Sequence, residues 1–192
     1  AALHALGRGD EITQRFGHHK AAPMVAQMLD RGLRCPPTSS LGRWFDAAAA
    51  LLGVRELAAF EGQAPMLLEA LAGGATPAAD FAELVPVTPD GQLDPLPLFA
   101  QLATRPAAEG AALFHHAIAD GLARWVLQAA ARENIAAVAL GGGCYLNVLL
   151  SRLVQDRLES VGLRVLQARQ APPNDGGIAL GQAWVALCSL ET

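Results

Sequence analysis

Apolar residues recur at helical spacing over the first two thirds of the chain, with turn-forming residues between the repeats. This spacing predicts helices. They cover residues 20–34, 38–52, 63–71 and 109–134. Pro36 and Pro37 stop the first helix, Gly53 ends the second, and Gly73 with Gly74 closes the third. The N-terminal part is therefore predicted to be mainly helical.

The pattern changes after residue 134, where a continuous apolar run over 135–140 predicts a buried strand. A helix over 146–158, a second strand over 163–166 and a last helix over 177–187 follow. The segment 76–98 contains five prolines, and Asp90-Gly91 between apolar residues predicts a short edge hairpin. We therefore expect one α/β domain over 1–192, with a helical part (1–75), a proline-rich connection (76–106) and an α-β-α-β-α nucleotide-binding part (107–192).

Composition narrows the class of protein. Hydrophobic residues make up 52% and charged residues 17%, which excludes disorder, and the net charge of −4 argues against a nucleic-acid partner. No apolar run approaches the roughly 20 residues that span a membrane. Three widely spaced cysteines suit reduced thiols in a cytoplasmic protein. The chain begins without methionine and in mid-pattern, so we expect part of a longer polypeptide.

Three glycines, Gly141, Gly142 and Gly143, separate the first predicted strand from the following helix. Backbone N–H groups at such a helix N-terminus bind phosphate readily, although the same glycines also suit a tight turn without a ligand. Asn147 lies one turn further on. Its amide is either a ribose or phosphate contact or a solvated surface group.

A second loop, PPNDGG over 172–177, follows the second predicted strand. Its Asp175 is either a ligand for a divalent metal or the N-cap of the last helix. Because the carboxyl ends of parallel strands share one edge of a sheet, we expect the amides near Gly142 and the carboxylate of Asp175 to converge on one anion-binding hollow. Asp46 is either a solvated helix residue or a group that points into this cleft.

The remaining reactive side chains give weaker signals. His18 with His19, and His115 with His116, are adjacent pairs, and neighbours on a helix point about 100° apart and cannot bind one ion together. We therefore expect no metal site built from this chain alone, with His115 bordering the apolar stripe and His116 facing away. Cys144 lies near a helix N-terminus, which lowers a thiol pKa. No residue has the setting of a nucleophile, so no catalytic residue is assigned.

Several segments read together resemble one enzyme family. They are CPPTSS running into GRWFD (35–46), FEGQ (60–63), the glycine pair with Asn147, PPNDGG (172–177) and GQ (181–182). Their order and spacing resemble the C-terminal part of the hydrogenase-maturation carbamoyltransferases of the HypF family over nearly the whole chain. The same architecture occurs in tRNA threonylcarbamoyladenosine transferases, which implies one lobe of an actin/sugar-kinase/Hsp70-like ATPase fold.

The resemblance implies an enzyme that makes carbamoyl adenylate from carbamoyl phosphate and ATP. It would pass the carbamoyl group to the C-terminal cysteine of the partner HypE, toward the cyanide ligands of [NiFe]-hydrogenase. It also implies site residues, with Asp46 at the ribose. The nucleotide-contacting residues would be Asp46, Gly62, Gly142, Gly143 and Asn147. Asp175 would complete a metal site.

The family's metal site also needs a His-x-x-x-His pair that this sequence lacks. The remaining ligands would lie in a missing N-terminal lobe, the metal stays open between Zn, Fe and Mg, and we expect the chain alone to be inactive. Three alternatives remain at this point: a tRNA-modifying relative, a non-catalytic nucleotide-binding or docking module, and a sugar- or acetate-kinase lobe.

Overall fold

The computed structural model describes residues 1–73 and 76–190, and these form a mostly helical α/β structure with a small parallel sheet. Gly74, which the sequence places at a helix end, lies outside the described residues. The helices are α1 (Ala2–Ala5), α2 (Asp10–Phe16), α3 (Ala22–Asp30), α4 (Leu41–Leu51), α5 (Gln63–Ala72), α6 (Phe81–Leu84), α7 (Leu96–Leu102), α8 (Ala107–Glu133), α9 (Val148–Glu159) and α10 (Ile178–Leu190). The strands are β1 (Ala137–Leu140) and β2 (Arg164–Gln167), and the 3₁₀ turns are η1 (Gly143–Leu146) and η2 (Asp175–Gly177).

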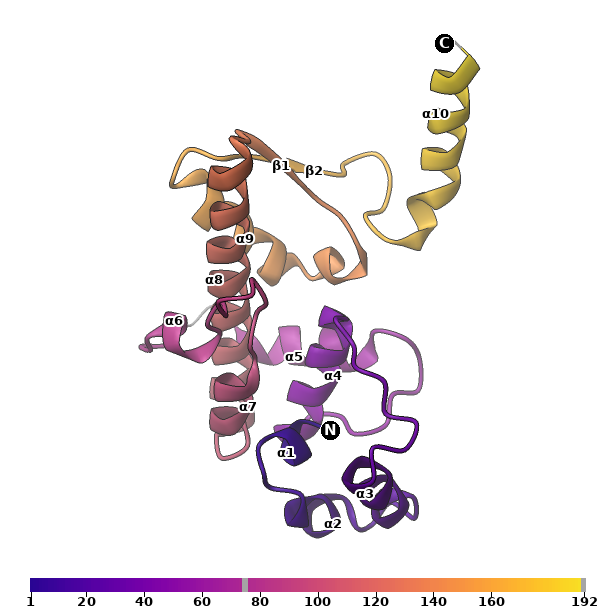
Figure 1. The fold of residues 1–192 in the computed structure, drawn as a ribbon, viewed down its shortest axis with the longest axis vertical. Coiled ribbons are helices and arrows are strands. Elements are labelled where there is room, and N and C mark those ends of the chain that lie inside the picture. Colours follow the sequence, from indigo (N-terminus) through magenta and orange to yellow (C-terminus); the bar gives the residue numbers. More distant parts are fainter. Residues whose placement is uncertain (74–75, 191–192) are drawn as a thin grey trace.

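Helix α8 is the central element, and α4, α5, α6, α7 and α9 pack against it (Figure 1). It confirms the long helix predicted over 109–134 and ends where Asn134 adopts the left-handed conformation with φ 54°. Both His115 and His116 are buried on α8. The expectation that His116 faces away from the core is wrong, because α5, α6 and α9 surround α8 on several sides.

The core joins α4 to α8 through aromatic side chains. Phe45 and Phe114 are 1% and 0% exposed, and their rings meet edge to face with centroids 4.8 Å apart. Each such burial stabilises the fold by about 1.5–3 kcal/mol before the entropy of ordering is counted. Since Asp46 follows Phe45 directly, this packing also fixes the position of a predicted site residue.

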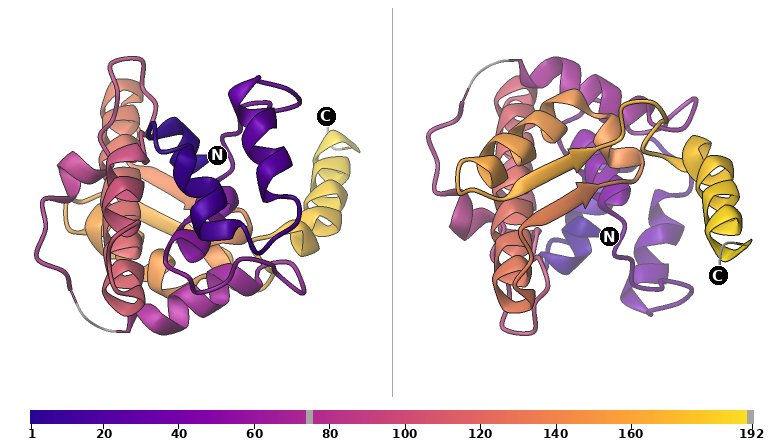
Figure 2. Two further views of the ribbon diagram at one scale, coloured as in Figure 1. Left: turned by 90° about the horizontal axis from the view of Figure 1, so that it is seen from below. Right: turned by 90° about the horizontal axis from the view of Figure 1, so that it is seen from above.

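The sheet consists of β1 and β2, which pair in parallel with Val138 opposite Val165. Helix α9 connects them, so the predicted β-α-β-α order is confirmed. The prediction of a fully buried strand is wrong. Ala139 of β1 and Leu166, its partner in β2, are both exposed, because helices cover one face of the sheet and leave the other open (Figure 2, right).

The proline-rich connection contains the short helices α6 and α7, which the sequence analysis did not predict. Between them, Val87 and Leu93 form an antiparallel bridge, which confirms the predicted hairpin. Trp125 on α8 is 44% exposed. Its indole Nε1–H donates to the Gly91 carbonyl at 2.8 Å and holds the hairpin tip against α8.

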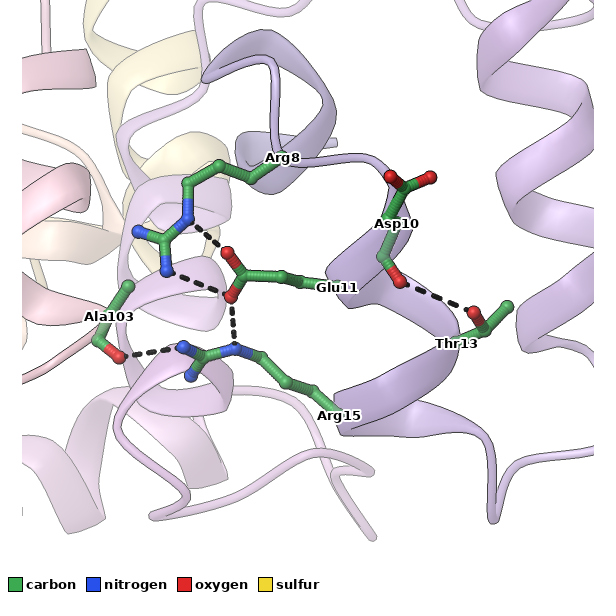
Figure 3. Close-up of polar contacts among 6 residues, drawn as sticks. All are labelled: Arg8, Asp10, Glu11, Thr13, Arg15 and Ala103. Atoms are coloured by element: carbon green, nitrogen blue, oxygen red, sulfur yellow. Dashed lines mark hydrogen bonds and ion pairs between the residues drawn. The ribbon is translucent and has the colours of Figure 1, made fainter.

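The N-terminal helices α1 and α2 attach to the body through a small ionic network (Figure 3). The carboxylate of Glu11 accepts hydrogen bonds from Arg8 and Arg15, and Arg15 also donates to the Ala103 carbonyl at 2.9 Å. The hydrogen bond from Arg8, followed by that from Arg15, lowers the pKa of Glu11. This network connects α2 to the end of α7.

Helix α10 stands away from the rest of the molecule in every view (Figures 1 and 2). All of its residues are exposed, including large apolar side chains such as Trp184 and Leu187. In the part of the chain that the structure describes, no helix combines the length and apolar character needed to cross a membrane.

Candidate functional site

The glycine loop leaves the end of β1 in a conformation that needs glycine. Gly142 has φ 104°, which other residues rarely adopt, and a Cβ built at Gly141 or Gly142 would meet no atom within 4 Å. This backbone is therefore open to a ligand on that side. The 3₁₀ turn η1 lies between the loop and α9, so the loop does not lead directly into the helix as the sequence suggested.

The N-terminus of α9 is already occupied by protein groups. The side-chain oxygen of Asn147 accepts from the Leu150 N–H at 2.8 Å, and the carboxylate of Glu69 accepts from the Leu149 N–H at 3.0 Å. The N–H groups of Leu149 and Leu150 at the start of this helix are therefore not bare, contrary to the expectation from the sequence, while phosphate binding at the glycine loop stays a prediction. No local pattern points to this contact, because Glu69 comes from α5, 80 residues before Leu149.

Asn147 is buried rather than solvated, at 7% exposure. Since its oxygen accepts from Leu150, its Nδ2 group faces His115 and donates to the ring Nε2 at 3.0 Å. The His115 Nδ1–H donates to the Ala111 carbonyl at 2.8 Å, which defines a neutral imidazole. Burial lowers the pKa of His115, and the nearby Glu69 charge only partly opposes this. The predicted nucleotide residue Asn147 thus also connects α9 to α8.

The second loop makes a tight turn before α10. Asn174, not Asp175, is the capping residue, and its side chain accepts from the Gly176 N–H at 3.1 Å. A Cβ at Gly177 would lie 2.7 Å from the Pro172 carbonyl oxygen, so only glycine fits there. Asp175 is exposed, and among the described residues its carboxylate has no hydrogen bond or ion pair.

The two loops adjoin, as the parallel-strand argument predicts. The Gly142 N–H donates to the Pro173 carbonyl at 2.6 Å, and a Cβ at Gly143 would lie 3.8 Å from the Cβ of Asn174. This hydrogen bond uses the Gly142 amide, so in this conformation it is not available to an anion. An open groove of about 590 Å³ continues from the loop along α10, between Pro172 and Trp184.

Asp46 lies beside the glycine loop. Burial, followed by the negative charge of Asp46, raises the pKa of the Cys144 thiol. The expectation of a lowered pKa is therefore wrong, since desolvation and this carboxylate outweigh the helix N-terminus. Asp46 itself is half-exposed and pairs with Arg43 at 2.8 Å. Gly62, with φ 82°, begins α5 on an exposed turn.

Sequence reasoning missed a second cluster, remote from these loops in the chain. His18 and His19 lie in the turn after α2, not on a helix, and both rings contact the same oxygen of Glu56. The argument that adjacent histidines diverge is therefore wrong here. Burial opposes ionisation of Glu56, but the hydrogen bonds from His19 and His18 outweigh it and lower its pKa.

Comparison with known families matches residues 1–182 to a family described as "Carbamoyltransferase, Kae1-like Domain, second subdomain". The chain is 45% identical to the carbamoyltransferase HypF2 of Cupriavidus necator, with 97% of the chain and 26% of that protein covered. It is 47% identical to a carbamoyltransferase HypF homolog of the same organism, covering 97% of the chain and 50% of the relative. The chain thus spans a quarter to a half of the length of these relatives.

Solved structures of the same kind are also similar. A crystal structure of full-length HypF in the phosphate- and nucleotide-bound form superposes with a TM-score of 0.83 at 27% identity, over 100% of this chain and 26% of that one. The crystal structure of T. kodakarensis HypF gives a TM-score of 0.75 at 26% identity, over 88% of this chain and 22% of the other. The fold described above is therefore shared with both.

Proposed function

Because the chain belongs to the HypF carbamoyltransferase family, through the second subdomain of its Kae1-like domain, we propose that it forms one wall of a nucleotide cleft. The other wall would be the first subdomain, within an ATPase-like fold of two lobes. The complete enzyme would use carbamoyl phosphate and ATP to form carbamoyl adenylate. A C-terminal cysteine of a HypE partner would then accept the carbamoyl group.

The observation that carries this proposal is the assembly of separate family segments at one place. The hydrogen bond from Gly142 to Pro173 joins the glycine loop to the PPNDGG loop. The charge of Asp46 acts on Cys144 within η1, which brings the GRWFD segment to the same loop. Parallel pairing of β1 and β2 explains why the two loops adjoin, but Asp46 comes to the same place from α4, and this convergence of three separate segments supports a shared binding role.

The residues present fit a nucleotide with one restriction. The open side of Gly141 and Gly142 lets a ligand approach the main chain without meeting a Cβ. Glu69, however, places a negative charge at the start of α9 and disfavours phosphate there. We therefore place the phosphates over the glycine loop and the ribose beside Asp46. Asn147 would act mainly by fixing the position of α9 relative to η1.

The chain could also supply one ligand, Asp175, to a metal site. Asp175 is exposed, in a turn closed by the Asn174 cap, so its carboxylate would be available to an ion shared with the first subdomain. Such an ion would neutralise phosphate charge. Whether it is Zn, Fe or Mg depends on the ligands that the other wall supplies.

The chain's own contribution to transfer is positioning and electrostatics. In the transfer step a thiolate of the partner cysteine attacks the carbamoyl carbon, a carbon–sulfur bond forms, and AMP leaves as the carbon–oxygen bond breaks. Cys144 does not supply that thiolate, because its raised pKa keeps it protonated. The main-chain groups of the glycine loop would instead face the phosphate that leaves with AMP.

Calorimetry with ATP and Mg²⁺ or Zn²⁺ tests the proposal, with the first subdomain supplied in trans. We expect Asp46→Ala and Asp175→Ala each to weaken binding about tenfold or more, since a charged hydrogen bond contributes about 1.5–3 kcal/mol. Asp156→Ala is the matched control, because Asp156 is an exposed carboxylate on α9. Its affinity should equal that of the wild type.

Unchanged affinity in both Asp46→Ala and Asp175→Ala would contradict the cleft and favour a docking module. The matching relatives are named HypF carbamoyltransferases, so no observation favours the tRNA-modifying or kinase alternatives. A carbamoyl-phosphate-dependent ATP–pyrophosphate exchange assay on the intact full-length protein measures activity. We expect no exchange from the chain by itself.

A further inference from the structure

The turn between α2 and α3 brings two imidazoles to one carboxylate. His18 Nε2 lies 2.6 Å and His19 Nε2 lies 2.5 Å from the same Oε2 of Glu56. Glu56 follows α4, 37 residues after His19, so the contact depends on tertiary structure. Among the residues that the structure describes, this is the one group of three potential ligands whose binding atoms all lie within 4.8 Å of one another.

Local geometry explains why adjacent histidines converge. A Cβ at Gly17 would collide with the Thr13 carbonyl oxygen, so glycine is needed where the chain leaves α2. The following residues adopt turn conformations in place of the helical 100° step. The two rings therefore lie with centroids 4.2 Å apart at an angle of 44°, and both Nε2 atoms point to Glu56.

The cluster is accessible. His18, Arg55 and Glu56 line an open depression of about 370 Å³, together with Gly53, Val54 and Leu57. The side chains of His18, His19 and Glu56 are 58%, 29% and 27% exposed. Hydrated ions can therefore reach the three ligand atoms. The α2–α3 turn lies at the end of the molecule away from the sheet, so the cluster is distinct from the cleft of the proposed function (Figure 1).

We propose that His18, His19 and Glu56 form a binding site for a divalent transition metal of the zinc type. Two imidazoles and one carboxylate are a ligand set that zinc takes in proteins, with a fourth position for water. Imidazole nitrogen is a poor ligand for Mg²⁺ and Ca²⁺, which prefer all-oxygen sites. Arg55 also lines the depression, and its positive charge disfavours cations that would be held by charge alone.

The observed separations suit this assignment. Ligand atoms about 2.0–2.1 Å from a tetrahedral zinc lie about 3.3 Å from one another. The two nitrogen–oxygen contacts at 2.5 and 2.6 Å would therefore open by about 0.7 Å each, within the reach of side-chain rotation. The ion would connect the α2–α3 turn to the segment after α4, and so fix the N-terminal helices to the body.

Titration of the 192-residue chain with Zn²⁺, followed by calorimetry, tests the site, and Co²⁺ absorption gives an independent spectroscopic readout. We expect the chain to bind one equivalent of metal. His18→Ala, His19→Ala and Glu56→Gln should each weaken binding about 100-fold or more, because loss of a ligand should cost at least as much as loss of a group that hydrogen-bonds to a ligand. Mg²⁺ should not compete. The thermal midpoint of the wild type should rise with Zn²⁺.

His4→Ala is the matched control, because His4 is also an exposed histidine near a carboxylate, with its Nε2 3.5 Å from Asp30. It should bind metal as the wild type does. Circular dichroism of each variant without metal establishes that it is folded. Absence of a one-equivalent event in the wild type would overturn the proposal, and so would wild-type affinity in all three ligand variants, which would place the metal on other groups such as the cysteines.

Discussion

At the scale of single residues, the buried pair of Asn147 and His115 both stabilises the fold and positions a candidate site residue. Asn147 caps α9 with its oxygen and donates to His115 with its nitrogen, so every polar atom of this buried pair has a partner. Replacing either side chain leaves a buried group unsatisfied, which costs about 1–3 kcal/mol. The position of α9 relative to α8 therefore depends on His115 remaining neutral.

The first prediction concerns pH. In the folded state the pKa of His115 lies below its ordinary value of 6.5, so on acidification the unfolded state binds a proton before the folded state does. The contribution of His115 to stability is therefore fully present above about pH 6.5 and is lost as the pH falls below that value. Urea unfolding between neutral and mildly acidic pH measures this slope.

The variant His115→Gln should lose much of that slope, while His4→Gln, at an exposed position, should keep it. Equal slopes in the wild type and in His115→Gln would contradict the assignment of a neutral, buried imidazole. Glu11 titrates separately, since its lowered pKa moves its contribution to more acidic solution.

At the scale of elements, glycines allow α8 to approach its neighbours closely. A Cβ at Gly121 would lie 2.7 Å from Cγ1 of the buried Val85, and one at Gly110 would collide with the Leu52 side chain. In a sequence, such glycines count only as a cost to the helix of about 1 kcal/mol each. In the structure they determine how near α8 lies to the segment just before the hairpin and to the end of α4.

The second prediction follows from this contact. Gly121→Ala should destabilise the chain by about 1 kcal/mol, because overpacking costs about 1–3 kcal/mol and improved helix propensity returns about 1. Chemical denaturation measures the change. Gly141→Ala is the control, since a Cβ there meets no atom within 4 Å, and it should change stability by less than about 0.5 kcal/mol.

Combining Gly121→Ala with Val85→Ala provides a further check, because the smaller side chain makes room for the new methyl group. The double variant should lose less stability than the sum of the two single changes. Strict additivity would show that the close approach of Gly121 to Val85 is not the cause.

At the scale of the whole molecule, the C-terminal helix is the part without a partner. The side chains of α10 that are apolar and exposed include Ile178, Leu180, Trp184, Val185, Leu187 and Leu190. A helix that is apolar on all sides is normally buried, and 13 residues alone are marginal as a helix in water. Since the chain spans only part of the length of its relatives, we propose that the first subdomain of the Kae1-like domain covers α10.

The third prediction tests that contact. Trp184→Ala should weaken association with the first subdomain about 30-fold, because a central aromatic residue at an interface contributes about 2 kcal/mol or more. Tryptophan fluorescence and light scattering on the mixed lobes measure association. Val161→Ala, an exposed apolar change after α9, is the control and should have no effect.

Much of the fold follows from local pattern. The apolar spacing places α4, α5, α8 and α9 within a few residues of their bounds, and the two apolar runs place β1 and β2. The short helices α1, α2, α6 and α7 were missed because pieces of four to seven residues carry too little periodicity, and packing rather than propensity stabilises them. The open face of the sheet was missed because an apolar run does not report which of its sides is covered.

For the site, local pattern was enough to identify the loops and residue types: the glycines at 141–143, the turn around Asp175, and Asp46 beside Phe45. The contacts of each group depend on how distant segments fold together. Glu69 accepts a hydrogen bond at the start of α9, burial and then the charge of Asp46 raise the pKa of Cys144, and His18 and His19 both contact Glu56. These pairs are 37 to 98 residues apart, and hydrogen bonds and charges act through distances in space that no local spacing encodes.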